Sequence, residues 1–199
     1  MKKKILALIT ALLVVACTGC AQSHDHTHEE TTTTEQVITS YVVTGTINGN
    51  TYKNDFAGLT FQKPAKWTFL EGDVLESLGG DSTVAIPDMA AVDGTTNSSV
   101  KLVFINSITI AGEAITAKEY CDSTIKTASS ESNMSTITAE SEVTLGGNKY
   151  IKIVIETADL NNPMTITHYV RAIDYYIVDI TATTPSAKVS DTNFESMFS

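Results

Sequence analysis

Three histidines near the start of the chain have a spacing that can hold a metal ion. His24, His26 and His28 alternate with other residues, and two glutamates follow them. Imidazoles two residues apart can converge on Zn²⁺, Cu²⁺ or Ni²⁺ if the chain closes round the ion, and carboxylates can complete the coordination shell. The surrounding residues 21–36 are polar and have no apolar periodicity, which predicts a disordered tether. Because the ion would have to order this segment, we expect modest zinc affinity, and a hydrated spacer is the alternative interpretation.

Residues 1–16 have the pattern of a secretory signal peptide. Three lysines at positions 2–4 precede the apolar run ILALITALLVVA, which ends in a small residue. The run is too short to span a bilayer permanently. The pattern therefore predicts export of the chain from the cytoplasm.

The end of this segment also predicts a covalent modification. The sequence Val14-Val15-Ala16-Cys17 resembles the lipobox of bacterial lipoproteins, in which the cysteine receives diacylglycerol and becomes the new N-terminus after cleavage. Cys20 is the alternative site, although a cysteine three positions before it departs from the usual Leu, Val or Ile. Acyl chains such as palmitate contribute about 0.8 kcal/mol per buried methylene, so either cysteine would hold the chain at the outer surface of a membrane. Plain secretion with ordinary cleavage remains the alternative.

The charge of the chain limits the partners that it can bind. The sequence has 13 basic and 23 acidic residues, which gives a formal charge of −10. Loss of residues 1–16 would remove three lysines and no acid, and would leave −13. Nucleic acids and anionic lipid headgroups are bound by clustered Lys and Arg. We therefore expect no nucleic-acid partner and no direct electrostatic adhesion to a membrane.

Residues 37–199 are long enough for one domain with a single core. This region lacks the motifs of the common hydrolases and nucleotidases: it has no G-x-S-x-G, no phosphate-binding loop and no H-E-x-x-H. Its single cysteine, Cys121, is expected as a small buried residue on a helix. Its single histidine, His168, is expected as a satisfied core or edge histidine. We therefore expect no catalytic residue in the domain.

Trp67, Tyr169 and Arg171 are the candidate contacts for a ligand or partner. Arg171 is the only arginine of the chain, and strand alternation places it on the same face as Tyr169. Two roles are open for it. It could form a cross-strand ion pair with Asp179 or Glu156, or it could anchor an anion or a carboxylate in a groove.

Periodicity predicts an α+β domain. Thr116 and Glu119 have the spacing of a capping box, so we expect a helix from 117 to about 129, and a shorter helix is expected near 74–78. The late strands alternate without long helical crossovers, which favours a central antiparallel sheet flanked by helices. A short helix is expected to close the chain over 190–198. The expected late strands are 135–145, 151–156, 164–172 and 176–182.

Several residues of the domain form a recognisable pattern: Gly45, Tyr52, Asn54, Gly58 to Phe61, Pro64, Trp67 and Thr116 to Tyr120. This pattern resembles that of small bacterial lipoproteins of the PsbP/Mog1-like fold. The resemblance implies an α/β/α sandwich around a central antiparallel sheet. It implies no single activity, because the better-known members are an extrinsic photosystem subunit and a regulator of a small GTPase, and no functional residue carries over.

The sequence thus predicts a lipid-anchored binding module outside the cytoplasm, whose partner is an envelope protein or a small ligand. Capture of zinc by the His-rich tether is the alternative function. An enzyme with an unrecognised site is the second alternative, and it requires convergent polar groups in a cleft.

Overall fold

The structure is a computed structural model that describes residues 44–80, 84–130, 134–157 and 161–199. The expected signal peptide, the lipidation sites Cys17 and Cys20, and the tether with its three histidines lie outside the described residues. Among the described helices, none combines the length and apolar composition needed to cross a bilayer.

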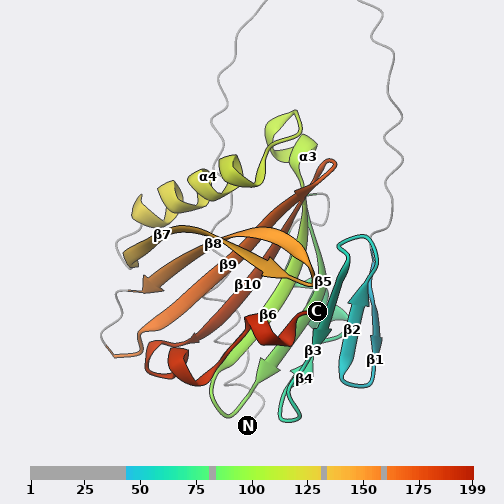
Figure 1. The fold of residues 1–199 in the computed structure, drawn as a ribbon, viewed down its shortest axis with the longest axis vertical. Coiled ribbons are helices and arrows are strands. Elements are labelled where there is room, and N and C mark those ends of the chain that lie inside the picture. Colours follow the sequence, from blue (N-terminus) through green and yellow to red (C-terminus); the bar gives the residue numbers. More distant parts are fainter. Residues whose placement is uncertain (1–43, 81–83, 131–133, 158–160) are drawn as a thin grey trace, which may run out of the picture.

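A seven-stranded antiparallel sheet forms the centre of the molecule (Figure 1). Its middle strands are joined to their neighbours by long, continuous ladders. Buried apolar residues lie on both faces of these strands because each face is covered by another layer. In spatial order the strands are β4 (Thr68–Phe69), β5 (Ala85–Asp93), β6 (Ser98–Asn106), β10 (Tyr176–Pro185), β9 (Met164–Ile173), β8 (Asn148–Thr157) and β7 (Met134–Leu145).

Helix α4 (Ala117–Ser130) lies against β7, β8 and β9 on one face of this sheet. The capping box predicted for its start is present: Glu119 accepts hydrogen bonds from the backbone N–H and the hydroxyl of Thr116, and the Thr116 hydroxyl accepts one from the Glu119 N–H. Cys121 is buried where α4 meets the sheet, beside Ile153 and Val170. The prediction of a buried cysteine on a helix is therefore confirmed.

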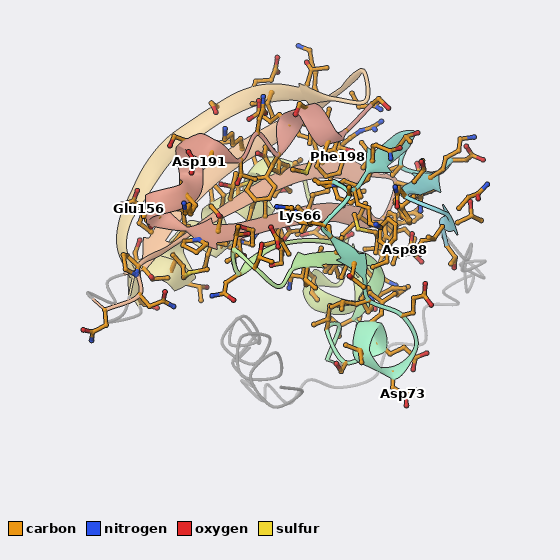
Figure 2. All side chains as sticks on the ribbon, turned by 90° about the horizontal axis from the view of Figure 1, so that it is seen from below. Lys66, Asp73, Asp88, Glu156, Asp191 and Phe198 are labelled. Carbon is orange, nitrogen blue, oxygen red and sulfur yellow. The ribbon has the colours of Figure 1, made fainter. Side chains whose placement is uncertain are left out.

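The opposite face is covered by a small antiparallel sheet and by the C-terminal segment. The small sheet has the order β1 (Thr46–Asn48), β2 (Thr51–Asn54) and β3 (Leu59–Gln62). The C-terminal segment contains two 3₁₀ turns, η1 (Ser186–Asp191) and η2 (Glu195–Met197). In Figure 2, the labels Asp191 and Phe198 mark this segment. Strand alternation separates the two cores: Ile177 belongs to the core under α4, and Val178 to the larger core under the small sheet.

One buried carboxylate fastens the small sheet to the large one. Asp88 of β5 is 8 % exposed and accepts hydrogen bonds from the hydroxyl of Tyr52, from Asn54 Nδ2 at 2.8 Å and from the backbone N–H of Gly45 at 2.9 Å. A β-carbon at Gly45 would overlap the Tyr52 ring, so only glycine allows this close approach. The register of the β5–β6 ladder shifts between Pro87 and Met89, which is where Asp88 turns toward the small sheet.

The α+β class and the central antiparallel sheet are confirmed. One covering layer is the helix α4, whereas the other is mainly the small sheet. The predicted closing helix is wrong, because residues 186–197 form two separate 3₁₀ turns that follow the sheet surface. Two further short helices are α2 (Asp73–Glu76), which was expected, and α3 (Ser107–Ala111), which was not.

Replacing Asp88 by alanine should destabilise the protein strongly. The change removes the acceptor shared by the Tyr52 hydroxyl, Asn54 Nδ2 and the Gly45 N–H, so we expect a loss of about 3 kcal/mol in the free energy of unfolding, measured by urea denaturation. Asp55→Ala is the matched control, because Asp55 is 85 % exposed and only pairs with Lys53, and it should cost less than about 1 kcal/mol. Equal losses for the two variants would show that Asp88 has no special role.

Candidate functional site

A buried polar cluster lies under α4, where β9 and β10 pair. The carboxylate of Asp179 lies 3.0 Å from Nδ1 of His168 and accepts a hydrogen bond of 3.0 Å from the Tyr120 hydroxyl of α4. The Asp179 side chain is 8 % exposed, and that of His168 is 15 % exposed. Lys101 of β6 and His168 of β9 both lie opposite Thr181 of β10, so the cluster crosses three strands.

The electrostatics of this cluster keep Asp179 ionised. Burial alone would raise the pKa of Asp179, but the neighbouring His168, the charge of Lys101 and the hydrogen bond from Tyr120 together lower it below its usual range. Burial lowers the pKa of Lys101, and the charge of Asp179 opposes that effect. Burial, followed by the charge of Asp179, raises the pKa of Tyr120. The cluster therefore has the properties of a fastening between α4 and the sheet, in which a buried charge is fully hydrogen-bonded.

A polar groove lies on the opposite face, between the strands β8 to β10 and the C-terminal segment. Its volume is about 350 Å³. One wall is the C-terminal segment, from Val189 to Glu195. The floor consists of side chains that strand alternation places on one face of the sheet: Lys152, Thr165, Thr167, Tyr169 and Thr184.

One ion pair crosses this groove from the sheet to its wall. Nζ of Lys152 lies 2.7 Å from Oε1 of Glu195, and the two side chains are 29 % and 39 % exposed. Nζ of Lys152 also lies 5.7 Å from the ring centroid of Tyr169. Burial, with the charge of Glu195 as the second cause, raises the pKa of the Tyr169 hydroxyl. Tyr169 is thus neutral, and the two charges of the groove are directed at each other.

The wall of the groove is fixed to the core by aromatic and backbone contacts. The Phe194 ring packs edge-on against Trp67, with 6.1 Å between the ring centroids, and Phe198 packs against Phe61 at 5.1 Å. The N–H of Ser199 donates to the Thr60 carbonyl at 2.9 Å, and the N–H of Thr60 donates back at 2.8 Å. The wall of the groove is therefore held by contacts within the protein.

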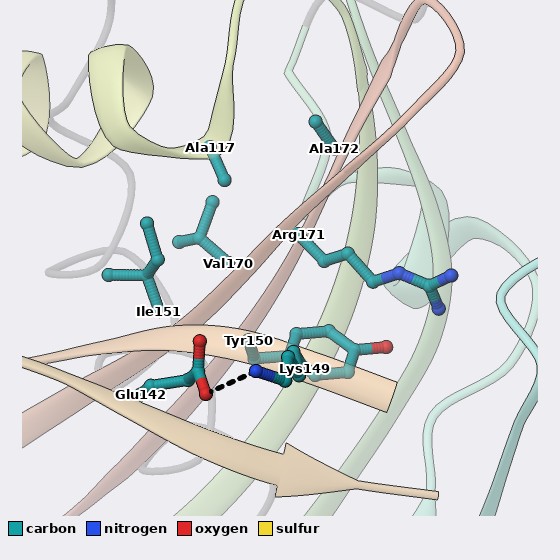
Figure 3. Close-up of a pocket in the computed structure, with 8 residues that line it drawn as sticks. All are labelled: Ala117, Glu142, Lys149, Tyr150, Ile151, Val170, Arg171 and Ala172. Carbon is teal, nitrogen blue, oxygen red and sulfur yellow. Dashed lines mark ion pairs between the residues drawn. The ribbon is translucent and has the colours of Figure 1, made fainter. Parts of the chain in front are cut away.

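A second hollow, of about 360 Å³, lies at the start of α4 (Figure 3). Ala117, Ile151 and Val170 line it, together with an ion pair of 2.8 Å between Lys149 and Glu142. Figure 3 shows the guanidinium of Arg171 directed away from that ion pair. Ala117, Ile151 and Val170 make this part of the lining apolar. Each charged residue of the lining has a partner: Lys149 pairs with Glu142, and Arg171 bonds to a backbone carbonyl.

The structure separates the three candidate contact residues. Tyr169 lies in the floor of the polar groove, and Trp67 is 5 % exposed behind the groove wall. Arg171 lines the second hollow and donates from Nη1 to the Ala57 carbonyl at 3.1 Å. Their contact with a ligand or partner stays a prediction. The suggested ion pair of Arg171 with Asp179 is wrong, because Arg171 lies opposite Val178 and Asp179 therefore occupies the other face.

His168 is a satisfied, partly buried histidine, as expected. Sequence reasoning missed the threonines of the groove floor. Alternation along the sequence could have revealed them, because Thr165 and Thr167 alternate with Ile166 and so share one face of β9. No pattern in the neighbouring sequence predicts that Glu195 pairs with Lys152. Among the residues that the structure describes, no group of three or more His, Cys, Asp or Glu side chains could hold a metal ion.

The structure of this chain is similar to solved structures of two other proteins. The solution structure of cyanobacterial PsbP (CyanoP) from Synechocystis sp. PCC 6803 matches with a TM-score of 0.51 and 12 % identity, over 81 % of this chain and 95 % of that chain. The Ran-binding protein Mog1p of Saccharomyces cerevisiae matches with a TM-score of 0.42 and 13 % identity, over 67 % of this chain and 78 % of that chain. No family model and no curated protein matches the sequence. The first similarity confirms the expected PsbP/Mog1-like fold, and at this identity it shows the fold alone.

Acid titration should reveal the role of Asp179. Its pKa is lowered in the folded state, so its contribution to stability is present above the ordinary aspartate pKa of about 3.9 and is lost as the pH falls from there through the folded pKa. Asp179→Asn should therefore destabilise the protein at pH 7 and should make its stability fall less steeply below pH 4. Urea denaturation across pH 2.5–7 measures both effects.

The matched control is Asp55→Asn, at an exposed position, which should change neither the stability at pH 7 nor the slope appreciably. A wild-type acid profile retained in Asp179→Asn would contradict the account of the cluster.

Proposed function

We propose that the chain is a non-catalytic binding module, anchored by lipid outside the cytoplasm, whose ligand site is the polar groove. The groove is the observation that carries this proposal. It is lined by hydroxyl and amide groups, and aromatic and backbone contacts fix its wall to the core. Such pre-organisation favours binding, because less conformational entropy is lost when the ligand arrives.

The composition of the hollows supports binding in preference to acid–base chemistry. Among the lining residues of the groove, Glu195 is the single carboxylate, and Glu142 is the single one in the second hollow. Neither lining contains a histidine or a cysteine. General acid–base catalysis uses groups placed within hydrogen-bond reach of a reacting atom, commonly histidine or two carboxylates. The His168–Asp179 pair lies on the other face of the sheet and serves α4.

The lipid anchor rests on the N-terminal sequence. A signal peptide followed by Cys17 supports diacylation there, with Cys20 as the alternative. The acidic character of the chain supports attachment through acyl chains, because a protein of this charge gains nothing from anionic headgroups.

Zinc capture is a second candidate function, favoured by the spacing of His24, His26 and His28. The described residues offer no metal cluster, so this function would depend on the tether. Calorimetric titration with zinc, before and after the three histidines are replaced by alanine, separates it from a spacer role.

The anchor predicts a specific modification. Protein extracted from the membranes of the producing cells should have the mass of a chain that begins at a diacylglyceryl cysteine, Cys17. Cys17→Ser should abolish this adduct and release the protein from the membrane fraction, whereas Cys20→Ser should leave both unchanged. The reverse pattern would assign the anchor to Cys20, and an unmodified wild-type chain would contradict the anchor.

The binding role predicts where a ligand acts. In a screen of oligosaccharides, short peptides, nucleotides and inorganic phosphate by ¹⁵N NMR, at least one compound should shift the amide signals of residues 165–169 and 190–195 together. These segments form the floor and the wall of the groove, so a ligand between them contacts both. Shifts confined to other surfaces, or no shifts with any compound, would contradict the groove as the ligand site.

A further inference from the structure

Hydroxyl groups dominate the polar lining of the groove. Thr165, Thr167 and Thr184 lie in its floor, and Ser190 and Thr192 lie in its wall. A hydroxyl group both donates and accepts hydrogen bonds, and it rotates to suit its partner. The lining therefore matches a ligand that presents both donors and acceptors.

One hydroxyl in the middle of the floor lacks a partner. Thr165 bonds to Ser186 at 3.0 Å, and Thr184 bonds to Ser98 at 2.7 Å. Thr167, which is only 9 % exposed, makes no side-chain hydrogen bond to any described residue. Thr167 lines the groove, so its hydroxyl is available to form a hydrogen bond with a ligand group there.

The charges of the groove disfavour an ionic ligand. Lys152 and Glu195 form the one ion pair of the lining, at 2.7 Å, and each neutralises the other. A charged ligand would have to break this pair before it gained a partner. An anion would also approach a chain of formal charge −10. The lining therefore favours a neutral ligand.

The backbone of the floor is unavailable to a peptide strand. Thr167 lies opposite Val154 of β8 and Ala182 of β10, in ladders that continue on both sides. Peptide recognition by strand addition requires an open sheet edge, and the floor has none. Recognition at the floor of the groove must therefore come from side chains.

We infer that the polar groove binds a neutral, polyhydroxylated ligand of the class of short oligosaccharides. This inference rests on the proposed binding role. The volume of about 350 Å³ lies in the range of small-molecule sites, roughly 300–1,000 Å³. Val189, which is 44 % exposed on the wall, provides apolar surface for the C–H faces of a sugar ring.

The test is an ¹⁵N NMR titration of the full chain with maltotriose, cellotriose and chitotriose as neutral probes. A neutral tripeptide and inorganic phosphate serve as comparison ligands. At least one of the three sugars should shift the signals of residues 165–169 and 190–195. Thr167→Val, which keeps the shape and removes the hydroxyl, should weaken that sugar about three- to tenfold.

Thr192→Val tests the wall of the groove and should also weaken binding of the sugar, so that the result does not depend on one buried substitution. Thr68→Val is the matched control, because Thr68 is exposed on β4 outside the groove, and it should leave the affinity unchanged. Equal affinities for all variants would overturn the inference.

The outcomes also separate this inference from the binding role. If the tripeptide or phosphate shifts the groove signals and no sugar does, the saccharide inference fails and the binding role stands. If none of the probes shifts the groove signals, the saccharide inference fails, and the wider ligand screen then decides the binding role.

Discussion

The hydrogen bonds accepted by Asp88 are the interaction on which the rest of this structure depends. They join β5 of the large sheet to Gly45, which precedes β1, and to Tyr52 and Asn54 of β2. With the small sheet fixed in this way, Phe61 of β3 covers the larger core and pairs with Phe198. The C-terminal segment is then held in place, and with it the wall of the groove. A buried carboxylate of this kind stabilises a fold only when all its partners are present, because an unpaired buried charge or donor is costly.

The other face of the sheet uses the same device. Asp179 is buried, and it joins Tyr120 of α4 to His168 of β9. The two carboxylates thus fasten the two covering layers to the central sheet. His168 and Asp179 thus hold α4 to the sheet. The polar groove is lined instead by hydroxyl groups and by the ion pair of Lys152 and Glu195.

Local signals predicted the elements, and non-local contacts decided the site. The capping box of Thr116 and Glu119 fixed the start of α4, and alternation placed His168 and Arg171 on opposite faces, because both signals operate within a few residues. The 3₁₀ turns of the C-terminal segment were missed because Phe194 and Phe198 are positioned by Trp67 and Phe61, more than 120 residues earlier in the chain. The partner of Asp179 was missed for a related reason. The residues that bond to Asp179 depend on which face of β10 is covered by α4.

The groove keeps its shape because its wall is fixed to β3 by contacts within the protein. Hydrogen exchange of the Ser199 amide tests this claim directly, since that N–H donates to the Thr60 carbonyl at 2.9 Å. The account predicts that the ligand-free protein protects this amide as strongly as amides of the small sheet, such as that of Tyr52. Exchange at the rate of an unstructured chain would show that the wall is not fixed, and would contradict the account.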